Sequence, residues 1–246
     1  MKNTLGMKNS FGIKNKLHWM VAAGLLGSSS VMAQNLTIDI SNITGGLYFT
    51  PLLVAAHDDN TSLFELGTPA SAHLQAMAEG GDIAGLVSDA EAASATLVAN
   101  PAEGLLAPGM EVMSVSLNTD GTQNDRLSIV AMLLPTNDGF VGLNNWKIPT
   151  TSGVYTIYLN AYDAGTEAND EIVNGAGAPG MPGIPAAPGG DAGTGATGVT
   201  TVETNSMVHI HRGGLGDADL AGGSSDLDSR VHRWLNPVAK VTIRVE

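Results

Sequence analysis

The run RLSIVAMLL, residues 126–134, is the feature that most restricts the fold of this chain. Apart from Ser128, every residue from Leu127 to Leu134 is apolar, so a strand here would carry apolar side chains on both faces. Such a strand must be covered on both sides, which places it at the centre of a layered domain. Turn-forming stretches bound the run, NTDGTQND before it and PTND after it.

Other segments have strand-like patterns, and turn residues separate them. Residues 71–100 differ, because they are rich in Ala and poor in β-branched residues; we expect short helices there, interrupted at Gly80 and Gly81. Since no βα unit repeats along the chain, the pattern predicts an all-β fold, an antiparallel β-sandwich. The further strand-like segments are residues 36–43, 45–56, 109–118, 153–165 and 238–246.

The first 33 residues have the layout of a secretory signal peptide. Four lysines and no acidic residue open the chain, a short apolar run covers residues 17–27, and small residues lead to a cleavage point after Ala33. The apolar run is too short to span a bilayer, and no later stretch reaches that length. We therefore expect an exported domain of residues 34–246, secreted or periplasmic, with no transmembrane span. The chain has no cysteine, so neither a lipid anchor nor a disulfide is expected.

Removal of the leader would make the chain strongly acidic. Four of its 11 basic residues lie in the leader, which leaves seven Lys and Arg against 24 Asp and Glu. A nucleic-acid partner is excluded, because phosphate binding needs a basic face. Attraction to anionic lipid is disfavoured for the same reason. Divalent cations and basic or neutral partners fit this charge better.

Residues 174–198, NGAGAPGMPGIPAAPGGDAGTGATG, have a composition unlike the rest of the chain. Glycine recurs at a three-residue spacing, but Ala186 breaks the period. A collagen triple helix needs an unbroken glycine repeat, so that structure is excluded. We expect a flexible, disordered and partly polyproline insertion between two strands.

Acidic side chains gather in three loops in the middle of the chain. Calcium takes about six to eight oxygens from carboxylates, carbonyls and water, and adjacent antiparallel strands could bring such loops together. Asp and Asn also favour ordinary turns, because their side chains bond the nearby backbone. The residues alone leave both interpretations open. The acidic residues are Asp120 and Asp125 in the first loop, Asp138 in the second, and Asp163, Glu167, Asp170 and Glu171 in the third.

Three blocks in a fixed order are similar to the spondin domain, the N-terminal type of F-spondin, which also occurs alone in exported bacterial proteins. The most specific parts are PTNDGFVG and YDAGTE. The resemblance runs roughly from Leu36 to Glu246. The blocks are DRLSIVAMLLPTNDGFVGLNN (residues 125–145), YTIYLNAYDAGTEAND (155–170) and LNPVAKVTIRVE (235–246).

The resemblance implies a β-sandwich similar to a C2 domain, with a calcium ion bound at one end. It implies Asp138 and Asp163 as calcium ligands, since they match the acidic residues of the family's PDWF and YDAGTDSG blocks. Asp120 corresponds to a third acidic ligand before the central strand, and Glu167 falls where the family has an Asp. The chain departs from the pattern at Gly139, where the family has a bulky aromatic residue.

His209 and His211 are two residues apart and would share one face of a strand, an arrangement that can bind zinc. No third ligand at a suitable spacing is evident, so we expect a surface or structural role for them. Catalysis finds little support, because G-x-S-x-G, H-E-x-x-H and a cysteine nucleophile are all missing. The aromatic residues that line sugar-cleaving clefts are few and scattered in the sequence. We expect that the protein is not an enzyme.

Taken together, the sequence and the resemblance predict an exported, calcium-binding module for adhesion or recognition at the cell surface or in the extracellular matrix. Its partner would be an extracellular protein or glycan. The alternative is a structural envelope or matrix protein in which calcium only stabilises the fold. Self-association on addition of calcium, without binding of a ligand, would favour this alternative.

Overall fold

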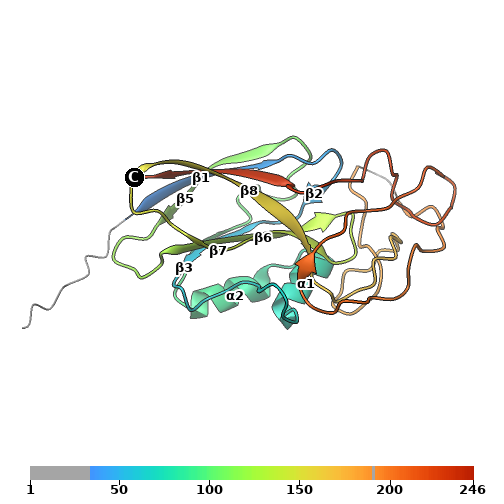
Figure 1. The fold of residues 1–246 in the computed structure, drawn as a ribbon, viewed down its shortest axis with the longest axis horizontal. Coiled ribbons are helices and arrows are strands. Elements are labelled where there is room, and N and C mark those ends of the chain that lie inside the picture. Colours follow the sequence, from blue (N-terminus) through green and yellow to red (C-terminus); the bar gives the residue numbers. More distant parts are fainter. Residues whose placement is uncertain (1–33, 190–191) are drawn as a thin grey trace, which may run out of the picture. The chain divides into compact units, whose positions relative to one another are not determined.

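The computed structural model describes residues 34–189 and 192–246; the predicted signal peptide, residues 1–33, lies outside the described residues (Figure 1). The strands are β1 (Asn35–Asn42), β2 (Tyr48–Phe49), β3 (Leu53–His57), β4 (Thr96–Ala99), β5 (Glu111–Asn118), β6 (Arg126–Leu134), β7 (Gly139–Lys147), β8 (Gly153–Asp163), β9 (His209–Ile210) and β10 (Ala239–Val245). The helices are α1 (Ala72–Gly80) and α2 (Ala84–Ala92).

The strands form an antiparallel sheet that folds into two layers, in the order β4-β3-β6-β7-β8-β10-β1-β5. Strand β8 belongs to both layers: residues 153–159 pair with β10, and residues 160–163 pair with β7. Figure 1 shows β8 crossing from the layer of β1 and β5 to the layer of β6 and β7. The predicted all-β antiparallel sandwich is confirmed, and a strand that changes layers is a known way to turn its corner.

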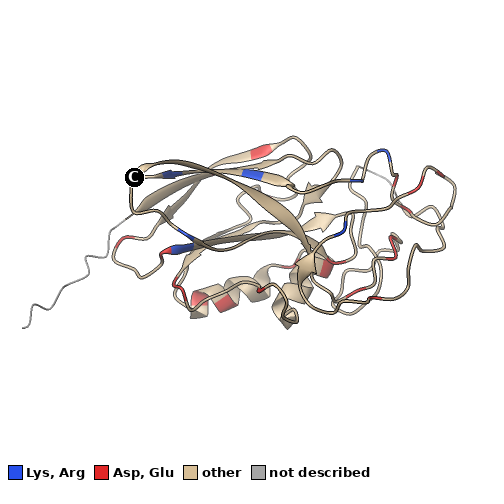
Figure 2. Ribbon diagram, viewed as in Figure 1, with Lys and Arg blue, Asp and Glu red and all other residues tan. Residues whose placement is uncertain are grey.

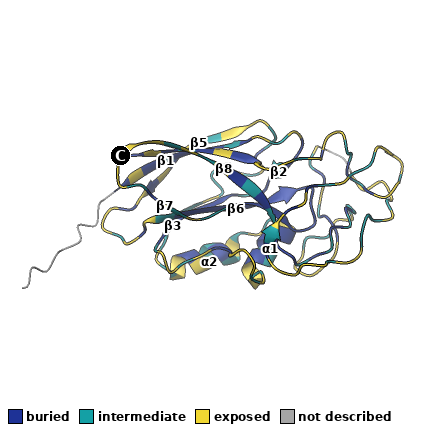
Figure 3. Cartoon of the chain, in the orientation of Figure 1, coloured by how far each residue is buried: buried dark blue, intermediate teal, exposed yellow. Residues whose placement is uncertain are grey.

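Strand β6 supplies side chains to two apolar cores. One face, with Leu127, Ile129 and Leu133, packs between the two layers, where β1, β5 and β10 also point their apolar residues. The other face, with Val130 and Met132, packs beneath α1 and α2. Figure 3 shows β6 in the colour of buried residues. The predicted central strand, covered on both faces, is therefore confirmed.

The two helices cover the outer face of the layer that contains β6. Ser71 caps α1, because its Oγ accepts a hydrogen bond from the N–H of Leu74 at 3.1 Å, and the left-handed Gly81 (φ 72°) ends the helix. The break predicted at Gly80 and Gly81 is confirmed. The helical prediction fails at its end, because residues 96–99 form β4 and pair with β3. In the part of the chain that the structure describes, no helix is long and apolar enough to cross a membrane.

Residues 174–189 and 192–198, where the sequence predicts a flexible insertion, have contacts with the rest of the domain. Ile184 is fully buried in the core beneath the helices. The N–H of Gly180 donates a hydrogen bond to Oε2 of Glu79, a buried residue of α1, at 2.6 Å. Composition suggested a free chain, but a buried side chain and an acceptor on α1 hold this segment to the domain.

Truncation of a core leucine should test the two-layer arrangement against a matched exposed leucine. Leu133 is fully buried between the layers, whereas Leu235 is 87% exposed. We expect Leu133→Ala to lower the free energy of unfolding by about 2–5 kcal/mol, since it removes buried methyl groups and leaves a cavity. Leu235→Ala should change it by less than about 0.5 kcal/mol. Urea unfolding of both variants measures this, and equal effects would contradict the burial described here.

Candidate metal centre

Two aspartates from separate loops meet at the end of the sandwich because of strand register. In the β7–β8 ladder Gly139 lies opposite Asp163, and the N–H of Ala164 donates to the carbonyl of Asp138 at 3.2 Å. Asp138, just before β7, and Asp163, the last residue of β8, are therefore neighbours. Both are buried, with 0% and 1% of their surface exposed.

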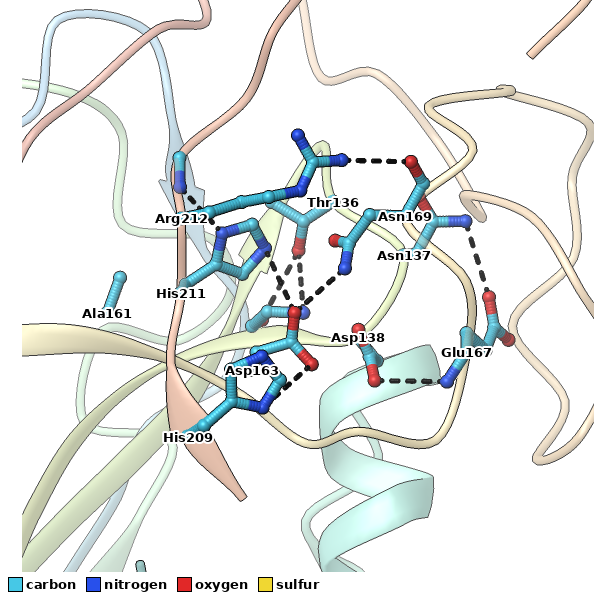
Figure 4. Close-up of polar contacts among 12 residues, drawn as sticks. Thr136, Asn137, Asp138, Ala161, Asp163, Glu167, Asn169, His209, His211 and Arg212 are labelled. Carbon is cyan, nitrogen blue, oxygen red and sulfur yellow. Dashed lines mark hydrogen bonds and ion pairs between the residues drawn. The ribbon is translucent and has the colours of Figure 1, made fainter. Parts of the chain in front are cut away.

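The PTND turn and the loop after β8 hold Asp138 in place (Figure 4). Thr136 Oγ1 accepts a hydrogen bond from the N–H of Gly139 at 3.0 Å and closes the turn. Oδ2 of Asp138 accepts the N–H groups of Thr166 and Glu167 at 2.7 and 3.1 Å. Oδ1 of Asp138 is buried without a hydrogen-bond partner. One oxygen of this carboxylate thus organises the loop, and the other is free to accept a ligand.

Asp163 has donors on both oxygens, all from the loop that follows it. Oδ1 accepts the N–H of Gly165 at 2.8 Å, and Oδ2 accepts Nδ2 of Asn169 at 2.8 Å. Gly165 has φ +71°, and a Cβ there would lie 2.7 Å from the carbonyl carbon of Ser206. The glycine of YDAGTE is therefore needed both for the turn and for the close approach of the chain before β9.

His209 and His211 flank Asp163, as Figure 4 shows. Nδ1 of His209 lies 3.8 Å from Oδ1 of Asp163, and Nε2 of His211 lies 3.9 Å from Oδ2. The same Nδ1 of His209 is 2.8 Å from the carbonyl oxygen of Met207, so it carries the proton. Nδ1 of His211 accepts the N–H of Gly213, so its proton is on Nε2.

Both ring nitrogens that face Asp163 are therefore N–H donors and have no lone pair for a metal. Burial lowers the pKa of His211 to about 3, which keeps this ring neutral. The structure does supply Asp163 as the third group that the sequence did not reveal beside the two histidines. These tautomers nevertheless argue against a zinc site, because zinc needs an unprotonated ring nitrogen.

Glu167 lies next to Asp138. Its Oε2 accepts the N–H of Gly183 at 3.1 Å and Nδ2 of Asn137 at 3.4 Å, while its Oε1 is buried without a hydrogen-bond partner. Asn137 also donates to Asp170 at 2.8 Å. Asn137 and Asn169 are thus parts of the site that the sequence interpretation missed; only their place inside the two acidic blocks could have pointed to them.

Asp120 does not join this site, and the prediction that it is a ligand is corrected. It is exposed, in the turn between β5 and β6, whereas Asp138 follows the other end of β6. At about 3.3 Å per residue, the nine-residue strand separates the two by roughly 25–30 Å. A loop that precedes a strand and a loop that follows it lie at opposite ends of the sandwich.

Three carboxyl groups of the site are buried without enough nearby positive charge or hydrogen-bond donors to stabilise their charged forms. Burial raises the pKa of Asp138 to about 7, and the neighbouring charge of Asp163 adds to this effect. Burial also raises the pKa of Asp163, and it raises that of Glu167 to about 7. A charged carboxylate is costly in a buried site unless a positive charge or enough donors offset it. A cation beside Asp138 would supply this offset.

Other acidic side chains nearby are fully occupied by the protein itself. Glu171 is buried and accepts the N–H groups of Leu215 and Gly216 at 2.6 and 2.8 Å, together with the hydroxyl of Ser225 at 2.6 Å. Asp226 accepts the N–H of Val173 at 2.8 Å. Figure 2 shows acidic residues spread through these long loops. For these residues the turn-forming interpretation is the right one.

The donor set of the site consists of hard oxygens, which suits calcium better than zinc. Asp138 Oδ1 and Glu167 Oε1 are each buried without a hydrogen-bond partner. Within residues 34–189 and 192–246, however, no three Asp, Glu, His or Cys side chains converge into a metal-binding group. A calcium ion would therefore need carbonyl, amide or water oxygens to complete its coordination, and these are ligands that calcium accepts.

Comparison with known proteins finds one family. Residues 42–172 match the family described as Spondin_N, which covers more than half of the chain and includes Asp138, Asp163 and Glu167. No curated protein matches the chain significantly. The matched region ends before the glycine- and proline-rich segment, so the match does not include His209 of β9 or His211 after it.

The departure at Gly139 has a local reason. A Cβ at this position would lie 2.7 Å from Oγ1 of Thr136 and 2.9 Å from Cδ2 of His211. The glycine therefore makes room for the buried His211 ring, which packs against Trp234 with ring centroids 4.9 Å apart.

The raised pKa of Asp138 predicts how stability depends on pH. Its pKa rises from 3.8 to about 7 on folding, so between these values the native state binds more protons than the unfolded state. In protein freed of divalent cations, the free energy of unfolding should then fall as the pH rises from about 4 to about 7. Glu167 acts in the same direction.

Asp138→Asn removes this titrating group and should flatten the curve, which urea unfolding across the same pH range measures. Asp120→Asn serves as the control and should keep the wild-type slope. A wild-type curve no steeper than that of Asp138→Asn would contradict the burial of an ionisable Asp138.

Proposed function

The chain belongs to the spondin N-terminal domain family, and on that basis we propose that it is an exported, calcium-binding module for adhesion or recognition at the cell surface or in the extracellular matrix. The family points to an extracellular module. That this chain binds calcium is our inference from the site.

The observation that carries the calcium proposal is the buried pair of Asp138 and Asp163. Their loops come from different strands, and register alone makes them neighbours. Oδ1 of Asp138 has no hydrogen-bond partner although it is buried. Glu171, by contrast, accepts hydrogen bonds on both of its oxygens.

In this proposal Asp138 and Asp163 bind the ion directly, and Glu167 supports it from the neighbouring loop. The ion would offset the charges that burial leaves uncompensated and would stiffen the loops before β7 and after β8. Extracellular calcium sites bind with dissociation constants up to about 10⁻⁴–10⁻³ M, which suits an exported protein. The module would act by binding and not by catalysis.

Export is the second part of the proposal. The predicted leader over residues 1–33 fits a chain that is exported across a membrane, and the absence of cysteine fits a domain that folds without disulfides. The acidic charge of the remaining chain fits a calcium-containing exterior better than a nucleic-acid or anionic-lipid partner. We propose a secreted or periplasmic location.

Thermal unfolding with and without calcium tests the site. After EDTA treatment, calcium at 100 times its dissociation constant should stabilise the native state by about 2.7 kcal/mol. For a chain of this size, that raises the melting temperature by roughly 5–10 °C. Magnesium, which is smaller and gives up its water less readily, should raise it less.

Asp163→Asn should lose the calcium-dependent rise, and Asp120→Asn, at the opposite end of the sandwich, should keep it. If the melting temperature of the wild-type protein does not change with calcium, the proposal is wrong. A calcium response accompanied by self-association and no ligand binding would favour a structural matrix protein.

A further inference from the structure

A groove opens where β7 and β8 part. Residues 139–142 of β7 pair with residues 160–163 of β8. Before Asn160, β8 pairs instead with β10 in the other layer, while β7 continues beyond Gly142 beside β6. The space between them is a groove of about 340 Å³. This volume is at the lower end of the roughly 300–1,000 Å³ that is typical of small-ligand sites.

Phe64 and Tyr162 line the groove and belong to an aromatic cluster with the buried Phe140. The ring of Phe64 lies 5.1 Å, centroid to centroid, from the rings of both Phe140 and Tyr162, and Phe140 lies 5.6 Å from Tyr162. Gly142 lets these rings pack on the backbone, because a Cβ there would lie 2.7 Å from Phe64 and 2.9 Å from Tyr162. This cluster is therefore formed before any ligand arrives.

The rim of the groove combines exposed apolar surface with uncharged polar groups. Tyr158 is 60% exposed and Leu66 is 51% exposed. Asn144 and Asn160 line the groove. Oδ1 of Asn144 already accepts a hydrogen bond from Oγ of Ser62 at 3.1 Å, so its NH₂ group is the part that can donate to a ligand. Among the described residues that line the groove, Glu65 alone carries a charge.

We propose that this groove binds a neutral saccharide. The exposed ring of Tyr158 offers a flat surface for the apolar face of a sugar ring, and the amide NH₂ of Asn144 can donate to a sugar hydroxyl. Anionic polysaccharides are disfavoured, because the one charged side chain in the groove is acidic and the chain is acidic as a whole.

The groove is separate from the carboxylate pair, although the same strand builds both. Side chains alternate along β8, so Tyr158, Asn160 and Tyr162 point to the face opposite that of Asp163. Saccharide binding therefore does not require calcium. A neutral saccharide would be the ligand of the proposed recognition module, and its binding can be tested independently of the calcium site.

Isothermal titration of the purified protein with neutral oligosaccharides tests the proposal. The probes are short oligomers of glucose, mannose, galactose and N-acetylglucosamine, with an oligogalacturonate as the anionic comparison. We expect saturable binding of at least one neutral oligomer, in EDTA as well as in calcium. Tyr158→Ala should weaken this binding about tenfold or more, because a central exposed aromatic residue dominates such contacts.

Val154→Ala is the matched control. Val154 is 66% exposed and on the same face of β8 as Tyr158, but it does not line the groove, so binding should be unchanged. Both variants should melt close to the wild type, since both side chains are exposed. Equal binding of the oligomer in EDTA and in calcium separates failure of this proposal from failure of the calcium site.

Three outcomes would overturn the inference. The first is that no neutral oligomer binds, and the second is that binding is equal in wild type and Tyr158→Ala. The third is that the groove takes only a short extended peptide, tested as an alternating Val–Thr peptide, which would assign it to a protein partner. Binding of the oligogalacturonate alone would count as the first outcome.

Discussion

The structure depends on one strand that pairs with both layers. Backbone N–H and C=O groups must find partners when they are buried, so β8 can leave β10 only by pairing with β7. This change of partner closes the sandwich, brings Asp163 opposite Gly139 and so beside Asp138, and opens the groove where β7 and β8 part. Because side chains alternate along β8, the carboxylate pair and the groove lie on opposite faces of the same strand.

Carboxylates organise the loops at the far end of β8 in a chain without disulfides. Glu79, Glu171 and Asp226 accept backbone N–H groups from segments distant in sequence, and this order reaches the glycine- and proline-rich segment. Asp138 and Glu167 follow the same pattern with one oxygen each and leave the other without a partner. An unsatisfied buried oxygen thus sets Asp138 and Glu167 apart from these structural carboxylates.

Much of the sandwich and half of the site could be predicted from the sequence. The apolar run of β6 predicted a strand between two cores, because both faces must be covered, and the blocks around Asp138 and Asp163 pointed to one end of the fold. Asp120 was misplaced because sequence order does not say at which end of a strand a loop lies. The groove was missed because Phe64 and Tyr158 are distant in the sequence and line the same groove only in the folded chain.

The sequence by itself determined most of the long strands, although not β4 or β7, and which side chains are apolar, since these follow from local periodicity and turn chemistry. It also placed an acidic residue just before β7 and another at the end of β8. Only the tertiary structure decided that the ladder sets these two residues side by side, that two imidazole N–H groups face Asp163, and that residues 174–189 pack on the domain. Those outcomes depend on register and on buried hydrogen-bond partners, which long-range contacts fix and local sequence does not.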